Sequence, residues 1–340
     1  MNLILALDFG GTKHAAAVVA SGEKHQLSDK RVFSPPNPHA QSDLEIMFSL
    51  ARKLLAGREP SAIGVSFGGP VDAASGTVRL SHHVSGWENI PLQEILEREF
   101  GVPASVDNDA NVAALGEHRY GAGMGYNSLL YITVSTGVGG GWILNDRPWR
   151  GIEGMAGEIG HVVVDPSGPV CLCGKRGCLE RLASGPYIAQ QTKDRLNLHP
   201  DKGKLLRSLC HDNLDEITGL MVSQAATQGD EIAIEALETA GWALGVAIGN
   251  VANLINPQRF ILGGSVTKAG DRFWNAIHHI ARATALPEVH FEIVPVALKD
   301  AAPLWGAVAL AEDLLVREVG SRESGVGGQG GQGDKGTRKN

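Results

Sequence analysis

The sequence predicts an α/β protein built from two lobes of similar design. Residues 3–19 and 129–144 each show an apolar run, a glycine-rich turn and a second apolar run, which predicts a strand, a turn and a strand. Each opening is followed by short apolar runs that alternate with helical patterns, as in α/β proteins. A cleft between two such lobes is a usual place for a ligand.

The composition fits a protein with a substantial buried core. The chain has 340 residues, of which 43% are hydrophobic, and its 44 glycines indicate many turns and close approaches. The formal net charge of −7 argues against nucleic acid as a partner. We find no apolar run of the ~18 residues that a membrane span needs, and no signal peptide. We therefore expect a cytoplasmic protein without a membrane partner.

In the first half of the chain, each element follows from its local pattern. The run "LILALD" ends in Asp8 and enters a turn at Gly10 and Gly11, and "HAAAVVA" returns as the second strand of a hairpin. Apolar spacing predicts a helix over 43–56, and "AIGVSFGGPVD" predicts a strand that enters a Gly-Gly-Pro turn. "PLQEILEREFG" predicts an amphipathic helix that ends at a glycine. "PASVDNDANVAALGEHRYG" predicts a strand, a polar turn and a helix capped by Asp or Asn.

The second half repeats this outline. "SLLYITVSTGVGGGWIL" predicts a strand, a glycine-rich turn and a strand. Helical spacing extends from about residue 203 to 254, and "RFILGGSV" then predicts a strand that enters a third glycine turn. "AAPLWGAVALAEDLL" predicts a closing helix. The segment from Gly320 onward contains Gly, Gln and charged residues without apolar anchors, which is typical of a disordered tail.

The three glycine turns have the chemistry of a phosphate site. The first offers the backbone N–H groups of Gly10 and Gly11 and the Thr12 hydroxyl, with the Asp8 carboxylate near a magnesium ion. "STGVGGG" and "GGS" offer two more turns. None matches the P-loop or the dinucleotide-binding pattern. Each turn alone is equally well read as a hairpin bend, but three of them at strand ends favour a nucleotide site.

The segment "VDNDAN" places two carboxylates between a strand and a helix. One of its polar residues is expected to cap the helix. Another is a candidate general base, which takes the proton from a sugar hydroxyl while the amides hold the ring. The residue types alone leave the choice between Asp107 and Asp109 open.

Three of the four cysteines, Cys171, Cys173 and Cys178, lie in one glycine-rich loop downstream of His161. Three thiolates and one imidazole make a closed four-coordinate zinc site of the structural kind. The C-x-C-x4-C spacing is not that of an ordinary zinc finger, so spacing alone leaves a redox cluster or three buried thiols as alternatives. Cys210 is expected to be an ordinary buried residue.

Taken in order, these motifs resemble the ROK family of sugar kinases, within the actin-like ATPase superfamily. The resemblance rests on "DFGGTK" (8–13), "DNDAN" (107–111), "STGVGGG" (135–141), "GEIGH" (157–161), "CLCGKRGCLE" (171–180) and "ILGGSV" (261–266). It spans residues 3–315, and the cysteine string with its upstream "GEIGH" is the most specific part. The resemblance implies a two-lobed actin-like ATPase (ribonuclease H-like) fold with the ligand cleft between the lobes.

The resemblance also implies where the lobes begin and end. We expect a small α/β lobe over residues 1–112, which includes a closing helix over 301–318. A large α/β lobe over residues 113–300 is expected to contain the zinc loop at 157–180. Residues 319–340 are expected to form the disordered tail, which the family core does not need.

The resemblance assigns a role to each candidate site residue. Asp109 matches the catalytic base. The residues that match sugar ligands are Asn108, Glu158, His161 and Glu180. Those that match the phosphate turns are Asp8, Gly10, Gly11, Thr12, Lys13, Ser135, Thr136, Gly137 and Gly139, and those that match the nucleoside end are Gly263 and Gly264. The zinc ligands are matched by His161, Cys171, Cys173 and Cys178.

The resemblance implies transfer of a phosphoryl group from ATP to a hexose, with Mg²⁺ at the phosphates and a structural Zn²⁺ in the loop. We expect a glucokinase that phosphorylates the sugar 6-hydroxyl and assembles as a homodimer or homotetramer. "GWENIPL" resembles a segment near the sugar in glucokinases, although core packing explains Trp87 equally well. The alternatives are an N-acetylmannosamine or N-acetylglucosamine kinase and, from another class, a non-catalytic sugar sensor of the family.

Overall fold

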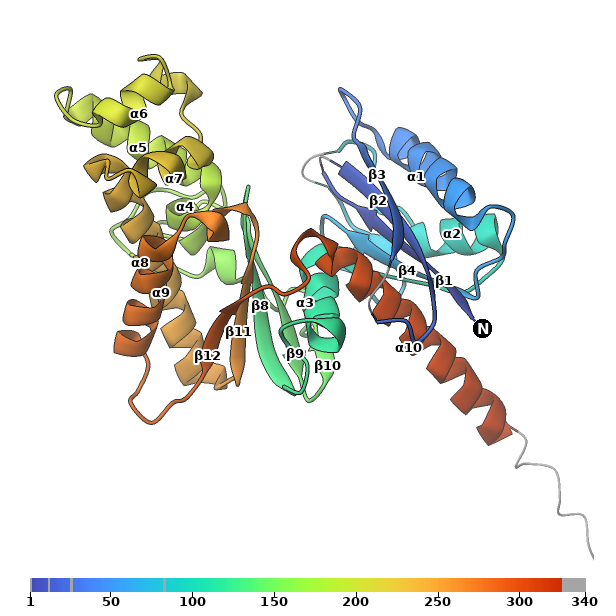
Figure 1. Ribbon diagram of the computed structural model, residues 1–340. Helices are drawn as coiled ribbons and strands as arrows, with labels where there is room; N and C mark the ends of the chain where they lie inside the picture. Colours follow the sequence, from blue (N-terminus) through green and yellow to red (C-terminus); the bar gives the residue numbers. More distant parts are fainter. Residues whose placement is uncertain (1, 12, 25–26, 82–83, 326–340) are drawn as a thin grey trace, which may run out of the picture.

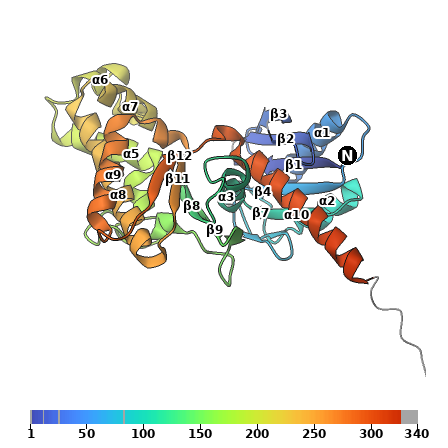
Figure 2. The same cartoon turned by 60° about the horizontal axis from the view of Figure 1, so that its bottom comes forward.

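A computed structural model of the protein describes residues 2–11, 13–24, 27–81 and 84–325. These residues form two lobes, each built on a five-stranded mixed sheet. Figures 1 and 2 show the lobes side by side, with helices α3 (Asp109–Tyr120) and α10 (Ala302–Gly325) at their junction. The sequence prediction of two similar α/β lobes is therefore confirmed.

The first sheet, which defines the small lobe, has the strand order β3-β2-β1-β4-β7. Its strands are β1 (Leu3–Phe9), β2 (Lys13–Ala20), β3 (Ser28–Phe33), β4 (Ala62–Phe67) and β7 (Ala104–Asn108). β1 pairs antiparallel with β2, as the predicted hairpin requires, and parallel with β4. The other elements of this lobe are α1 (Ala40–Leu55), α2 (Leu92–Phe100) and the short strands β5 (Val71–Asp72) and β6 (Thr77–Val78).

Both faces of the small-lobe sheet are buried, which explains why its strands are apolar without alternation. Leu5 and Leu7 of β1 join the core that contains α1 and α2. Ile4 and Ala6 of the same strand point to the other face and join the core that contains α3 and α10. The sheet is thus covered by helices on both sides.

The second sheet, which defines the large lobe, has the order β10-β9-β8-β11-β12. Its strands are β8 (Ser128–Val134), β9 (Val138–Leu144), β10 (Arg147–Trp149), β11 (Arg259–Gly263) and β12 (Glu292–Pro295). The helices and helical turns around it are η1 (Ile159–His161), α4 (Leu179–Ala183), α5 (Gly185–Leu198), α6 (Lys204–Leu209), η2 (Leu214–Glu216), α7 (Gly219–Thr227), α8 (Glu231–Ile255), η3 (Ser265–Lys268), α9 (Asp271–Thr284) and η4 (Lys299–Ala301). β8 and β9 form the predicted second hairpin.

Among the described residues, helix α8 is long and apolar enough to cross a membrane by length and composition alone. Most of it is buried, however, and its side chains belong to the core of the large lobe together with those of α9. Packing within the fold therefore accounts for its apolar character.

Helices α3 and α10 pack against each other between the sheets, in a core that both lobes share. The expected lobe boundary at residue 112 falls inside α3, so the chain crosses between the lobes after that helix, in residues 121–127. The return crossing is residues 296–301, before α10. Helix α10 continues to Gly325, so residues 319–325 of the expected tail are helical. Residues 326–340 of that expected tail lie outside the described residues.

Candidate functional site

A cleft of about 800 Å³ lies between the two lobes. The small lobe contributes the segments that follow β1, β4 and β7, where the carboxyl ends of neighbouring parallel strands meet. The large lobe contributes the β8–β9 turn, residues 154–161 and Glu180. This arrangement brings together motifs that are far apart in the sequence.

The two carboxylates of "VDNDAN" have different surroundings. The buried Asp107 accepts hydrogen bonds from Arg150 Nε at 2.6 Å and from Asn111 Nδ2 at 3.2 Å, so its oxygens are occupied by protein donors. Asp109 lies in the cleft wall at the first position of α3, where its Oδ1 accepts from the N–H of Ala110 at 2.8 Å. Asp109 is therefore the carboxylate of this pair that a substrate can reach.

The position of Asp109 changes its acidity. Burial, reinforced by the nearby Asp8 carboxylate, raises the pKa of Asp109 to about 6. Burial also raises the pKa of Asp8, although a hydrogen bond from Ser66 Oγ at 2.8 Å opposes this effect. A carboxylate whose pKa approaches the working pH is suited to general-base catalysis.

The two expected phosphate turns face the same cleft from opposite lobes. In the small lobe, Gly10 N donates to Lys13 O at 3.1 Å to close the turn, and Gly11 lies in the cleft wall. Asp8 and Lys13 flank this turn without forming part of the wall, and Thr12 lies outside the described residues.

In the large lobe, the expected phosphate residues Ser135, Thr136, Gly137 and Gly139 all line the cleft. The glycines that follow them in "STGVGGG" have another reason to be small. A Cβ on Gly141 would lie 2.3 Å from the carbonyl oxygen of Ala110, so this glycine lets α3 approach β9.

The four expected sugar ligands all lie in the cleft wall: Asn108, Glu158, His161 and Glu180. Asn108 also caps α3, since its side-chain oxygen accepts from Ala110 N at 3.0 Å, and its amide donates to Gly69 O at 3.0 Å. Glu180 accepts from Val138 N at 3.0 Å, which fixes its carboxylate beside the β8–β9 turn.

The four expected zinc ligands are also brought together. One ligand atom each from His161, Cys171, Cys173 and Cys178 lies within 4.8 Å of all the others. The sulfur atoms of Cys173 and Cys178 are 3.5 Å apart, and thiolates on a tetrahedral zinc at about 2.3 Å lie roughly 3.8 Å apart. His161 Nδ1 is buried without a hydrogen-bond partner. The donor set, its spacing and this unpaired nitrogen fit a structural zinc ion.

A second cavity of about 570 Å³ adjoins the first, and both share Ser135 and Thr136. Its wall is largely apolar and includes the first residues of α5 and α7 and residues 265–268. Sequence reasoning missed the contributions of α5 and α7. The sequence signals there are the helix starts "SGPY" and "TGLM", which by themselves do not indicate a ligand.

The expected nucleoside residues Gly263 and Gly264 are not in this wall. A Cβ on Gly263 would lie 2.8 Å from Val296 Cγ1, and Gly264 has a φ of +92° and lies against the Val134 carbonyl. These glycines shape the end of β11, and the residues directly after them, Ser265 and Val266, reach the second cavity. Trp87 is fully buried and likewise absent from the cleft wall.

Known proteins share this sequence and architecture. The chain is 38% identical to a glucokinase of Streptomyces coelicolor over 80% of this chain and 84% of the relative. The structure matches a ROK family glucokinase from Streptomyces griseus, solved with glucose and AMPPNP, with a TM-score of 0.78 and 34% identity, over 92% of this chain and 100% of that one. A xylose repressor of Caldicellulosiruptor bescii is 31% identical over 78% of this chain and 67% of its own.

The expected two-lobed actin-like ATPase fold agrees with this structural match. The sequence profile of the ROK family matches residues 4–314, which is nearly the whole described chain. The chain therefore belongs to the ROK family.

Proposed function

We propose that this protein is a glucokinase, which transfers the γ-phosphoryl group of ATP to the 6-hydroxyl of glucose. The chain is an ATP-dependent sugar kinase of the ROK family, and the proposal concerns its sugar, its acceptor hydroxyl and the roles of its residues. The main support is Asp109, a carboxylate with a pKa raised to about 6, in the same cleft wall as Gly11, the Ser135–Gly139 turn and the four expected sugar ligands.

Asp109 takes the proton from the attacking hydroxyl, and Asn108, Glu158, His161 and Glu180 hold the sugar so that this hydroxyl faces Asp109. Gly11 of the first turn and the Ser135–Gly139 turn lie in the cleft wall from opposite lobes and would face the phosphates. Asp8, at the end of the strand that enters the first turn, is the carboxylate that would hold Mg²⁺. When bound, magnesium-ATP supplies the phosphoryl group and neutralises charge on it.

The Cys3His cluster would hold a structural Zn²⁺, as proposed from its donor set. Cys178 immediately precedes α4, which contains Glu180, and His161 belongs both to the cluster and to the cleft wall. The cluster thereby fixes two sugar ligands relative to each other. A ligated histidine keeps one ring nitrogen free for a hydrogen bond, here toward the sugar.

The identity of the sugar is supported by the glucokinases among the relatives and by paired carboxylates in the wall. Glu158 and Glu180 can each accept hydrogen bonds from neighbouring ring hydroxyls, and such a site rejects sugars that lack them. The likeness to a xylose repressor makes a non-catalytic sugar sensor the second candidate. The accessible base and the adjoining second cavity favour the enzyme.

The deciding experiment measures ADP release from ATP with glucose, galactose, 2-deoxyglucose, N-acetylmannosamine and N-acetylglucosamine. We expect kcat/KM for glucose to exceed that for either acetamido sugar at least tenfold, which is about 1.4 kcal/mol. A tenfold preference for an acetamido sugar would assign the chain to that class instead. Sugar binding by calorimetry without turnover of any sugar would identify a sensor.

A further inference from the structure

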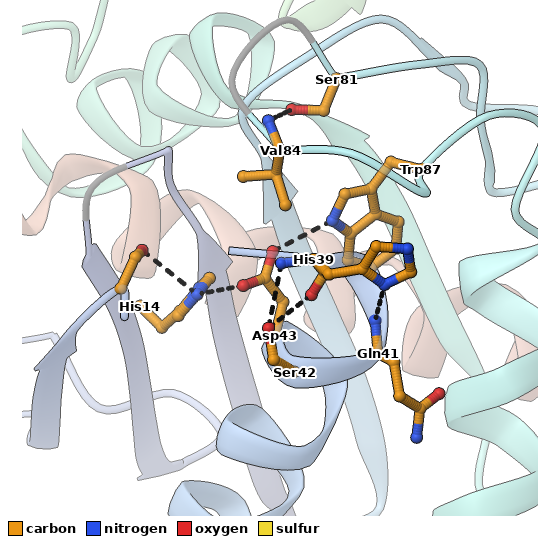
Figure 3. A network of polar contacts seen from close by, with 9 residues as sticks. His14, His39, Gln41, Ser42, Asp43, Ser81, Val84 and Trp87 are labelled. Carbon is orange, nitrogen blue, oxygen red and sulfur yellow. Dashed lines mark hydrogen bonds and ion pairs between the residues drawn. The ribbon is translucent and has the colours of Figure 1, made fainter. Parts of the chain in front are cut away.

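Three polar side chains that the proposed reaction does not use form a buried network in the small lobe (Figure 3). Asp43, which is 2% exposed, accepts hydrogen bonds from Trp87 Nε1 at 3.0 Å and is 2.9 Å from His14 Nε2. His14 and Trp87 are completely buried. The residues come from β2, the first turn of α1 and the segment before α2, so the network ties together three separate parts of the lobe.

A buried polar network stabilises a core less efficiently than apolar packing does. Burying a carboxylate costs several kcal/mol, and apolar residues of similar volume are often as stable. His14 Nδ1 is buried without a hydrogen-bond partner, but both Asp43 oxygens are paired. Such directional bonds give the parts that they join one defined arrangement. The network contacts two parts of the site.

The first part is the phosphate turn. His14 directly follows Lys13, the last residue of the turn, and Phe9 directly precedes Gly10, the residue at its start. The Phe9 ring lies edge-on to the His14 ring at a centroid distance of 5.9 Å and to Trp87 at 5.7 Å. One end of the turn is therefore joined to the network by His14 itself, and the other end contacts the network through the Phe9 ring.

The second part is the wall of the cleft. Ser34 lines the cleft, and its Oγ lies 3.4 Å from His14 Nε2. The wall continues through Pro35 and Pro38 to His39, which caps α1, the helix that contains Asp43. The network therefore holds the wall at both of its ends.

We propose that His14 and Asp43 are positioning residues, which set the phosphate turn and the Ser34–Pro38 wall in one arrangement for phosphoryl transfer. This inference rests on the proposed function. Neither residue touches the cleft, so they act through the segments that they hold. A misplacement of about 1 Å in such a site is enough to reduce turnover strongly.

The inference predicts an effect on turnover without a matching effect on binding. The second cavity and three of the four expected sugar ligands belong to the large lobe, which the network does not contact. We therefore expect His14→Leu to lower kcat at least tenfold at 25 °C, with KM for ATP within threefold of wild type. Glucose affinity, measured by calorimetry without nucleotide, is expected to stay within twofold.

Two variants and a control separate positioning from stability. In His14→Gln the amide keeps a donor for Asp43, so kcat should recover to within threefold of wild type. Asp43→Asn, whose amide is isosteric but offers an oxygen to only one of the two donors, should lower kcat and tests the network if His14→Leu does not fold. The control is His118→Leu, which removes another largely buried histidine, paired with Asp146 at 3.2 Å and outside both cavity walls. It should lower Tm but leave kcat unchanged.

Folded variants that lose Tm but keep kcat within twofold would overturn the inference, because the network would then be only structural. A parallel loss of glucose affinity would also overturn it, because it would indicate general disorder of the lobe. A wild-type protein that phosphorylates no sugar would instead overturn the proposed function, so the two failures are distinguishable.

Discussion

At Asp109, the same burial that suits a carboxylate to catalysis makes it costly to the fold. Its neighbour Asp107 shows the opposite arrangement, because protein donors occupy its oxygens. We expect Asp109→Asn to lower kcat by about 10²–10⁴, the usual contribution of general acid–base catalysis, with little change in glucose affinity. Asp107→Asn should have a much smaller effect on kcat and should mainly loosen Arg150. Steady-state kinetics of both variants tests this, and the reverse ranking would contradict the assignment of the base.

Because its pKa is raised, the ionised Asp109 carboxylate destabilises the folded protein at neutral pH, and we expect its replacement by Asn to stabilise the fold. The folded pKa of about 6 exceeds the ordinary value of about 4, so the folded protein binds this proton more tightly than the unfolded chain. The free energy of unfolding therefore falls as pH rises from about 4 to about 6, and the penalty remains above that range. Asp109→Asn removes it, so Tm at pH 7.5 should rise above that of wild type, while the difference should vanish near pH 4. A variant less stable than wild type at pH 7.5 would contradict the burial of this charge.

The sequence allows a prediction of which residues belong to the site, but not of which residues surround each of them. The motifs predict four sugar ligands and four zinc ligands, and the structure brings the residues of each expected set together. The sequence could not distinguish Asp107 from Asp109 by residue type, because the difference lies in Arg150, which is distant along the chain. It also could not show that Gly263 and Gly264 leave no space for a Cβ, since that depends on residues from other strands.

At the scale of an element, the loop of the proposed zinc site joins the Cys3His cluster to one side of the cleft. Cys171→Ser should reduce zinc content below one ion per chain and weaken glucose binding more than ATP binding. The loop holds two expected sugar ligands, His161 and Glu180, and among the phosphate turns Glu180 bonds to Val138 N of the β8–β9 turn. Elemental analysis and calorimetry measure the two effects. The matched control is Cys210→Ser, a buried cysteine outside the cluster, which should keep its zinc. Full zinc in the Cys171→Ser variant would exclude this ligand set.

Helix α3 contains a second element-scale feature, because its completely buried Glu117 binds both segments that cross between the lobes. Its carboxylate accepts from Ala122 N at 2.7 Å in one crossing, and from Leu298 N at 2.8 Å and Ala297 N at 3.1 Å in the other. Glu117→Gln replaces one acceptor oxygen by an amide that cannot accept. The buried N–H group left without a partner should lower the free energy of unfolding by about 1–3 kcal/mol.

Urea unfolding measures this loss for Glu117→Gln. The matched control is Glu97→Gln on α2, where a partly exposed glutamate accepts from one backbone group, Ala104 N at 3.0 Å. Its loss should be smaller, because water can replace the missing acceptor. Equal losses in the two variants would show that the interlobe position of Glu117 has no special role.

For the molecule as a whole, the sequence predicted the two-lobed α/β architecture because both lobes open on the same strand–turn–strand pattern. It could not place α3 and α10, which form a core with strands of both sheets. Helical periodicity shows which face of a helix is apolar, but not which sheet covers it.

We expect the two lobes to move closer together when the sugar binds. The cleft is lined by Gly68–Val71, Asn108 and Asp109 on one side, and by the β8–β9 turn, residues 154–161 and Glu180 on the other. A sugar that binds both walls stabilises the arrangement in which they are closer, and such closure excludes water from the reaction. Saturating glucose should therefore reduce the radius of gyration measured by small-angle X-ray scattering, and Glu158→Gln should need more glucose to reach the same value. An unchanged radius at saturation, with binding verified by calorimetry on the same sample, would mean that the cleft already has its closed form without sugar.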